Sequence, residues 1–195
     1  MKELGRRGRA LTALLFVIAG GIGIISSTQT WFTVVRVDGA ADVPVAGADA
    51  MPVLAPLSLA VLALSAAIAI VGPVMRIVFA IIAMLIAGSL GTATLVIALE
   101  HPVSAVASTL SELVGLMGEE ALAPMIASIT GTPWPWIALV AWVVLFLGGI
   151  FALLTARHWK VGGRRFQTSS STPHDGPIDA VESWDDLSHG TDPTR

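Results

Sequence analysis

The run from Val74 to Leu99 constrains the fold more than any other part of the sequence, because its interior is apolar throughout. Its one charged residue, Arg76, lies near its start. As a helix the run would be about 39 Å long at about 1.5 Å per residue, which is enough to cross a hydrocarbon core of about 30 Å. Of the 195 residues, 54% are hydrophobic and 13% are charged, whereas a soluble domain carries about 25% charged residues. The sequence therefore predicts an integral membrane protein.

Further apolar runs predict three more spans beside the one at 74–99, at about residues 10–27, 51–71 and 136–155. The first run follows a basic segment and is either a span or the apolar region of a signal peptide. We favour an uncleaved helix, because the run is longer than an ordinary signal-peptide core and no clear cleavage site follows it. Gly72-Pro73 separates the second run from the third, so these two helices are expected to form a tight antiparallel hairpin.

The basic residues indicate how the spans are oriented, because they gather in the connections on one side. Four precede the first span, Arg76 lies at the turn between the second and third, and four follow the last span, namely Arg157, Lys160, Arg164 and Arg165. The two other connections hold Arg36 alone. By the positive-inside rule both termini are expected to be cytoplasmic. We expect the membrane to be an inner (plasma) membrane. The four basic residues after the last span are candidate contacts for anionic lipid headgroups, a position that favours lipid over nucleic acid.

The two extracytoplasmic connections differ in pattern. Residues 33–50 mix β-branched residues with glycine and proline, and because a lone strand there would lack a partner we expect irregular chain or a small hairpin. Residues 100–133 carry an apolar stripe at helical spacing with Ser and Glu opposite. The stripe predicts an extracytoplasmic amphipathic helix between the third and fourth spans, and it consists of Val106, Leu110, Leu113, Val114 and Met117.

Tryptophans lie at the edges of the predicted spans, and they are Trp31, Trp134, Trp136 and Trp159. Tryptophan in such places is typical of the aromatic belt, so these four are candidate interfacial anchors. Inside the third span the most polar patch contains Ser89, Thr92 and Thr94. Helix hydroxyls usually bond to a carbonyl of the preceding turn, which favours a packing surface over a path for a solute.

From Gln167 onward Ser, Thr, Pro, Gly and acidic residues replace the apolar ones. Such a composition cannot bury enough surface to fold alone, so residues 167–195 are predicted to be a mostly disordered cytoplasmic tail after a membrane domain at 1–166. Within the tail, Trp184 and Leu187 would lie on one face of a single helical turn. We take Trp184, Asp185, Asp186 and Leu187 as candidate docking residues for a cytoplasmic partner, with an ordinary disordered end as the alternative.

The chain resembles the tryptophan-associated transmembrane protein family, bacterial proteins of about this length encoded among tryptophan-biosynthesis genes. The resemblance covers nearly the whole chain and rests on the four spans, on the tryptophans at their edges and, above all, on the ending from Trp184 to Thr194. The family more often has an aspartate at the position of Ser188 and a tyrosine at that of Phe166, so no role for a charge or a phenol is carried over there. Since the family has no established activity, the resemblance implies a tryptophan-biosynthesis context rather than a reaction.

Enzyme chemistry needs titratable groups that converge, and no predicted span carries one in its interior. The chain has no cysteine, and phosphate-loop, dinucleotide and HExxH motifs are absent. We therefore predict a protein that is not an enzyme and that has no cofactor or metal. The leading interpretation is an accessory or scaffold protein that docks a cytoplasmic partner through its tail. The alternative is a small oligomeric transporter or facilitator for an aromatic amino acid or a related apolar metabolite, and the sequence leaves homo-oligomerisation open.

Overall fold

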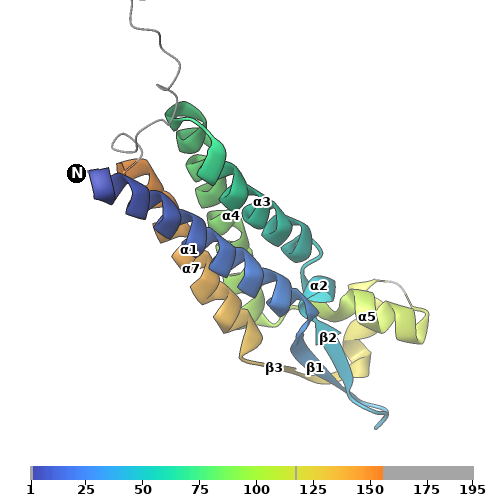
Figure 1. Ribbon diagram of the computed structural model, residues 1–195. Coiled ribbons are helices and arrows are strands. Elements are labelled where there is room, and N and C mark those ends of the chain that lie inside the picture. The colour runs from blue at the N-terminus through green and yellow to red at the C-terminus, as the bar shows by residue number, and fades with distance from the viewer. Residues whose placement is uncertain (1, 117, 156–195) are drawn as a thin grey trace, which may run out of the picture. The chain divides into compact units, whose positions relative to one another are not determined.

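The computed structural model describes residues 2–116 and 118–155, and these are mostly helical. Four long helices of the described residues lie side by side (Figure 1): α1 (Lys2–Thr28), α3 (Leu54–Ile70), α4 (Pro73–Glu100) and α7 (Trp134–Thr155). We name them the bundle. At one end of the bundle lie β1 (Thr30–Arg36), β2 (Val43–Ala46), α2 (Gly47–Ala50), α5 (Ser104–Val114), α6 (Glu119–Leu122), the 3-10 helix η1 (Ala123–Met125) and β3 (Ile126–Gly131). The described residues of 29–53 and 101–133 are named the cap.

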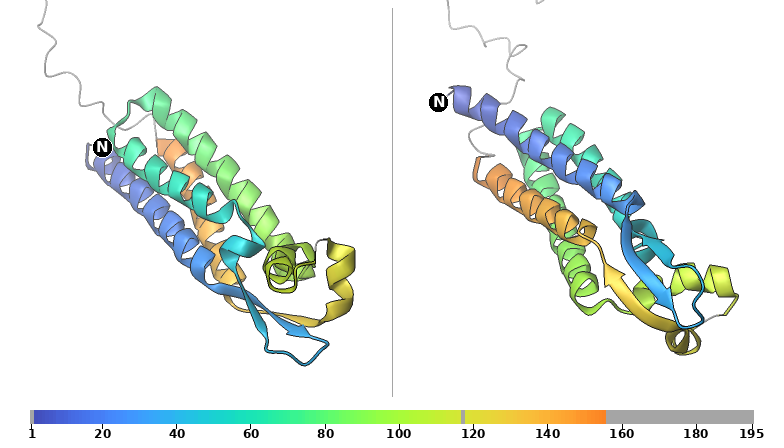
Figure 2. Two further views of the ribbon diagram at one scale, coloured as in Figure 1. Left: turned by 90° about the vertical axis from the view of Figure 1, so that its right-hand side faces the viewer. Right: turned by 90° about the horizontal axis from the view of Figure 1, so that it is seen from below.

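Helices α1 and α7 each pack along two bundle helices, and α1 lies along both α3 and α7 (Figure 2). Helix α7 in turn packs along α4, whereas α3 and α4 contact each other much less. Helix α3 ends at Ile70 and α4 begins at Pro73, so the tight hairpin predicted from Gly72-Pro73 is present. Proline suits the first position of α4, since the N–H it lacks would have no partner within the helix.

Three helices of the described residues are long and apolar enough to cross a membrane, namely Gly8–Thr28, Val74–Glu100 and Trp134–Thr155. They coincide with three of the predicted spans. The remaining helix, α3, is apolar but has 17 residues, which corresponds to about 26 Å. It begins at Leu54 rather than at residue 51, because the Leu54 N–H bonds to the Met51 carbonyl oxygen at 3.0 Å in a turn that precedes the helix. A fourth span at α3 stays a prediction.

Small residues let the bundle helices approach closely. A Cβ added at Gly20 of α1 would lie 3.1 Å from the carbonyl oxygen of Ser58 on α3, and one added at Gly149 of α7 would lie 3.3 Å from that of Ala80 on α4. Both neighbours are backbone atoms, which a side-chain rotation cannot move aside. The buried face of α4 is itself rich in alanine, with Ala80, Ala83, Ala87 and Ala98. Association of helices in a membrane depends on such close packing.

The strands form one sheet in the order β2-β1-β3, with β1 antiparallel to both neighbours. Thr33 of β1 lies opposite Pro44 of β2 on one side and Thr130 of β3 on the other. The small hairpin expected for this connection is present as β1 and β2. The third strand, β3, was not expected, and with it the fold is mostly helical rather than all-α. The second partner of β1 comes from the connection between α4 and α7, so no local pattern in the sequence could pair the two strands.

The cap has an apolar core of its own, formed by the fully buried side chains of Trp31, Phe32, Val34, Val45, Leu110 and Leu122. Helix α5 packs on α2 and β2. From the predicted amphipathic stripe, Val106 and Leu110 are buried and Val114 is half-buried, whereas Leu113 is 61% exposed. Helix α5 ends at Val114, and Gly115 after it has a φ of 72° and forms a left-handed C-cap. Met117 lies outside the described residues. Part of the stripe thus packs into the cap.

Candidate functional site

Trp142 of α7 fills the centre of the bundle, where its side chain is 1% exposed. A Cβ added at Gly23 of α1 would lie 2.6 Å from the Cη2 atom of Trp142 and 3.0 Å from the Cβ of Ser58 on α3. A Cβ added at Gly91 of α4 would lie 3.7 Å from the Cβ of Trp142. The indole thus lies where all four bundle helices meet. Gly23 of α1 makes room for it, whereas a Cβ at Gly91 of α4 would be in ordinary van der Waals contact with Trp142.

Buried polar atoms in the bundle differ in whether they have a hydrogen-bond partner. The Ser58 hydroxyl donates to the carbonyl oxygen of Leu54 at 2.6 Å, the usual bond of a helix hydroxyl. Thr94 of α4 is fully buried, and its Oγ1, like Nε1 of Trp142, has no hydrogen-bond partner among the described residues. These groups are hydroxyls and an indole, which do not titrate near neutral pH. The interior of the described bundle can therefore offer hydrogen bonds but no acid-base chemistry around Trp142.

The one buried arginine of the described residues, Arg76, lies at the end of the bundle away from the cap. Its side chain is 3% exposed, and its Nη2 donates to the carbonyl oxygen of Val71 at 2.9 Å. This bond joins the first turn of α4 to the residue that follows α3. Arg76 thus has a structural contact at the helical hairpin, at the edge of the third predicted span where the sequence places it.

The polar patch predicted inside the third span is divided between two faces of α4. Ser89 and Thr92 are exposed, and their hydroxyls donate to the carbonyl oxygens of Ile86 and Gly88 at 3.0 and 2.9 Å. Thr94 instead faces the interior, where it is fully buried. The three hydroxyls therefore do not form one continuous polar surface within the described bundle.

A second buried tryptophan, Trp31 of β1, joins the cap to the bundle. Its Nε1 donates to both the carbonyl oxygen and the Oγ of Ser26 on α1, each at 3.0 Å. Gly47 packs against the indole, since a Cβ added there would lie 2.6 Å from Nε1. The sequence predicts an interfacial anchor at this position. The structure places the ring inside the protein with 0% exposed, where it has no surface to offer to lipid headgroups.

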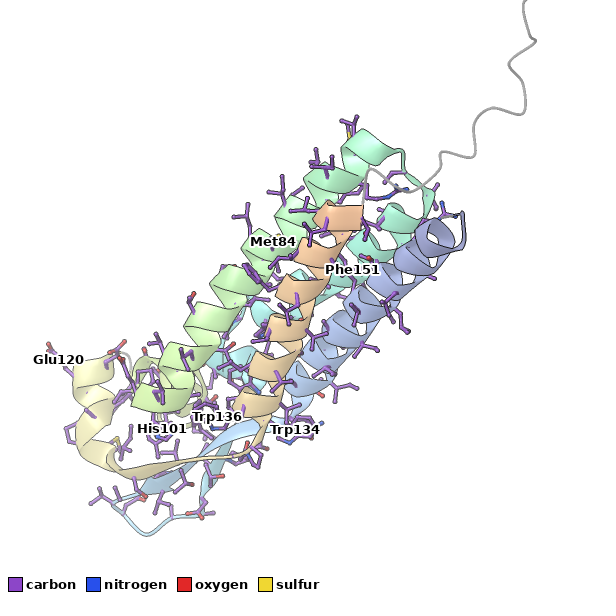
Figure 3. The ribbon with its side chains drawn as sticks, turned by 90° about the vertical axis from the view of Figure 1, so that its left-hand side faces the viewer. Met84, His101, Glu120, Trp134, Trp136 and Phe151 are labelled. Atoms are coloured by element: carbon purple, nitrogen blue, oxygen red, sulfur yellow. The ribbon has the colours of Figure 1, made fainter. Side chains whose placement is uncertain are left out.

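Three labelled rings lie near the junction of bundle and cap in Figure 3, namely those of His101, Trp134 and Trp136. His101 follows α4 with a left-handed φ of 44°, and its ring meets that of Phe32 edge-on with centroids 5.3 Å apart. Gly131 leaves space for this contact, because an added Cβ would lie 2.9 Å from Nε2 of His101. Trp134 is half-buried and Trp136 is 48% exposed at the start of α7. Their interfacial role stays a prediction.

The described residues contain no group of three or more His, Cys, Asp and Glu side chains that could hold a metal ion. A hollow of about 210 Å³ lies between the β1–β2 hairpin and η1, lined by Val37, Asp38, Pro124 and Met125. Ligand pockets usually measure about 300 to 1,000 Å³, so this hollow is small for a metabolite.

Several predicted site residues lie outside the described residues. They are the candidate docking residues Trp184, Asp185, Asp186 and Leu187, the candidate headgroup contacts Arg157, Lys160, Arg164 and Arg165, and the candidate anchor Trp159. Trp142 was not among the predicted site residues. One feature of the sequence could have indicated its position: Trp142 lies in the middle of a predicted span rather than at its edge. The other spans contain glycines against which such a large side chain can pack.

A family model described as tryptophan-associated transmembrane protein matches residues 13–194, which is nearly the whole chain. No curated protein and no solved structure matches. The match confirms the resemblance that the spans and the tail ending indicated, and together with the three long apolar helices it establishes a transmembrane protein.

Proposed function

Because the chain belongs to the tryptophan-associated transmembrane protein family, we propose that it is a non-enzymatic accessory protein of the bacterial inner membrane that docks a cytoplasmic partner through its C-terminal tail. The observation that carries this proposal is the filled centre of the bundle. Trp142 occupies the place where α1, α3, α4 and α7 meet, which supports a membrane anchor rather than a passage. The family description supports a partner related to tryptophan metabolism.

The orientation proposed for this anchor has both termini in the cytoplasm and the cap outside. The start of α1 and the end of α7 lie at the end of the bundle away from the cap (Figure 1). Helix α3 connects the cap to the turn at Gly72, so it crosses the membrane if its neighbours α1 and α4 do. A helix about 4 Å shorter than the hydrocarbon core of about 30 Å is accommodated by local thinning at modest cost. The distribution of Lys and Arg supports the same orientation.

The tail is the part of the chain best suited to a partner on the cytoplasmic side. Burying Trp184 and Leu187 in a groove would contribute about 1.5 to 3 kcal/mol for each fully buried side chain. Acidic tail residues could instead pair with Arg157, Lys160, Arg164 and Arg165, but exposed ion pairs contribute only about 0 to 1 kcal/mol each, and anionic lipid competes for the same cations. A partner with an apolar groove therefore outcompetes self-docking.

Affinity capture from native membranes after crosslinking tests the proposal. We compare the full chain, Trp184→Ala and a deletion after Phe166, with Trp159→Ala as a control that removes a tryptophan outside the tail ending. The proposal expects one set of cytoplasmic proteins with the full chain and with Trp159→Ala, and the loss of that set in the other two. An identical set from all four would overturn tail docking.

The competing interpretation, an oligomeric facilitator for an aromatic amino acid, makes a different prediction. It requires the exposed hydroxyls of Ser89 and Thr92 to line a path between copies. Loss of tryptophan uptake or efflux in Ser89→Ala and Thr92→Val, at normal membrane levels, would favour that interpretation. If the protein is an anchor, we expect both variants to show the same tryptophan uptake and efflux as the full chain.

A further inference from the structure

Strand β3 is an edge of the sheet, because the order is β2-β1-β3 (Figure 1). Its residues Ala127, Ser128, Thr130 and Gly131 are exposed. An exposed edge strand presents backbone N–H and C=O groups in a row, which is a template for pairing with another strand. What can pair with β3 depends on its free backbone groups, on its two faces and on the charges around it.

The register shows which backbone groups of β3 are free. The Thr132 N–H donates to the carbonyl oxygen of Trp31 at 2.9 Å, and Thr130 lies opposite Thr33. Hydrogen-bonded and non-hydrogen-bonded pairs alternate along an antiparallel ladder, so the backbone groups of Ile129 and Gly131 point away from β1. No other strand of the described residues pairs with β3. These two residues define the free edge of β3.

The two edges of the sheet differ in how they are protected. Strand β2 is four residues long and contains Pro44, which has no N–H to offer. Strand β3 is six residues long and contains no proline, and no charged residue occurs between Glu120 and Arg157. Short length, proline and charge are the devices that normally prevent edges from pairing. The free edge of β3 lacks all three.

The two faces of β3 determine which side chains an added strand would carry. Ile129 is half-buried, packs against buried apolar residues and lies opposite the buried Val34 of β1. Ser128 and Thr130 lie on the other face and are exposed. Because an added strand continues both faces of the sheet, apolar side chains next to Ile129 would alternate with polar or charged ones on the face of Ser128 and Thr130.

The charge of the cap selects among such strands. The described residues of the cap include six acidic residues and one arginine, Arg36, which pairs with Asp38. The other five acidic residues are exposed and are not balanced by a basic residue of the cap; they are Asp42, Asp49, Glu112, Glu119 and Glu120. A field of this sign attracts a basic segment and repels an acidic one, including the cap of a second copy.

Carboxylates also lie toward both ends of β3. Glu119 and Glu120 belong to α6, which leads through η1 into the strand, and Figure 3 shows Glu120 on that side of the cap. At the other end Glu100 precedes His101, whose Nε2 would lie 2.9 Å from a Cβ added at Gly131. Basic side chains near the ends of an added strand would therefore meet opposite charge.

We propose that the free edge of β3 binds an extended basic segment of a partner protein as a fourth strand, in which apolar residues alternate with lysine or arginine. Backbone hydrogen bonds to Ile129 and Gly131 supply affinity, and the acidic cap selects basic residues. Binding at this edge is separate from docking by the tail, because the cap and the end of α7 lie at opposite ends of the bundle (Figure 1).

A synthetic peptide with the sequence Lys-Val-Lys-Val-Thr-Val-Lys-Val-Lys tests this binding, and a peptide with glutamate in place of lysine is its control. The full chain is held in nanodiscs of zwitterionic lipid, which leave both ends of the bundle accessible. Fluorescence anisotropy of the labelled peptides measures Kd. We expect saturable binding of the lysine peptide that weakens as salt is added, and none of the glutamate peptide. Equal affinity for both peptides, or no binding of the lysine peptide, would overturn the proposal.

A proline at the edge separates strand pairing from attraction by charge alone. In Ile129→Pro the N–H that points away from β1 is lost while the bonds to β1 remain, and Ile129→Val is the matched control. Because one backbone hydrogen bond to the peptide is lost, Ile129→Pro should raise the Kd of the lysine peptide about tenfold. Ile129→Val should leave it unchanged. The same Kd in all three proteins would contradict strand addition at β3.

A charge placed on β3 gives a second measurement, which holds if the proline variant fails to fold. Ser128→Lys puts a cation on the exposed face of β3, and the control Ala41→Lys puts one at an exposed position in the β1–β2 connection. A like charge on a neighbouring strand should raise the Kd of the lysine peptide about two- to fivefold in Ser128→Lys, and Ala41→Lys should change it less. Equal changes would show that the peptide responds to the overall charge of the cap and would overturn binding at this edge.

Discussion

Trp142 and Trp31 are both buried, but the bundle and the cap hold them in different ways. Trp142 lies against glycines on two helices, and its N–H has no partner among the described residues. Trp31 lies in the cap core, and its N–H reaches two oxygens of Ser26. The bundle thus depends on shape at this point, whereas the cap and its attachment to α1 depend also on specific hydrogen bonds. Substitutions at the two tryptophans and their neighbours can break or sharpen this difference.

The largest loss is expected from Trp142→Ala, because the cavity lies where four helices meet. Replacing a buried tryptophan by alanine lowers the free energy of unfolding by about 3 to 5 kcal/mol. Unfolding in detergent mixtures, followed by circular dichroism, measures the loss. The control is Trp136→Ala at a ring that is 48% exposed, where the effect should be much smaller. Equal losses at both positions would mean that Trp142 is not central to the packing.

The next largest effect should come from overfilling the same place. Gly23→Ala puts a Cβ at 2.6 Å from the Cη2 atom of Trp142, and overpacking of this kind lowers the free energy of unfolding by about 1 to 3 kcal/mol. Gly21→Ala is the matched control on the same helix, since an added Cβ there meets nothing within 4 Å. The same unfolding assay applies. If Gly23→Ala left the free energy of unfolding unchanged, the bundle centre would have space for an added methyl group, which contradicts the close packing described above.

In the cap, Trp31→Phe keeps most of the ring volume and removes the donor to Ser26. The loss of a buried hydrogen bond that leaves its acceptor unsatisfied costs about 1 to 3 kcal/mol. Ser26→Ala should cost less, because the indole keeps its bond to the carbonyl oxygen of residue 26. Trp142→Phe removes an N–H that has no partner among the described residues, so any loss in the free energy of unfolding comes from the smaller side-chain volume alone. A hydrogen-exchange measurement of the cap amides should respond to the Trp31 variant and not to the Trp142 variant.

The smallest effects are expected at the outer face of α4. The hydroxyls of Ser89 and Thr92 bond to carbonyl oxygens of their own helix and are exposed. Ser89→Ala and Thr92→Val should therefore change the free energy of unfolding by no more than about 0.5 kcal/mol. Membrane expression and unfolding midpoints provide the measurement. A clear loss of stability would show that this face is covered by protein.

The difference between the bundle and the cap explains which parts of the fold the sequence could predict and which it could not. Helix-forming apolar runs and the Gly72-Pro73 break are local features, so three long helices and the hairpin followed from them. The cap depends on pairing between β1 and β3, which lie far apart in the chain, and a short uncharged strand such as β3 carries no signal for its partner. For that reason the sequence predicts at most a small hairpin after the first span and does not predict the third strand.

The site residues show a similar limit. A tryptophan next to a predicted span edge fits the aromatic belt, yet the turn between α1 and β1 folds Trp31 back onto Ser26 and buries it. Whether a side chain faces lipid or protein is decided by the neighbouring elements, and single-sequence patterns do not contain that information. The role of Trp142 depends on which glycines of α1 and α4 oppose α7, which is again a matter of tertiary packing.

The flux of radiolabelled tryptophan into proteoliposomes that contain the full chain tests most directly whether the bundle is an anchor rather than a passage. The account predicts uptake equal to that of protein-free liposomes, and no increase in Trp142→Phe, because packing closes the bundle. Saturable uptake above the protein-free control, abolished by Ser89→Ala and Thr92→Val, would contradict the account.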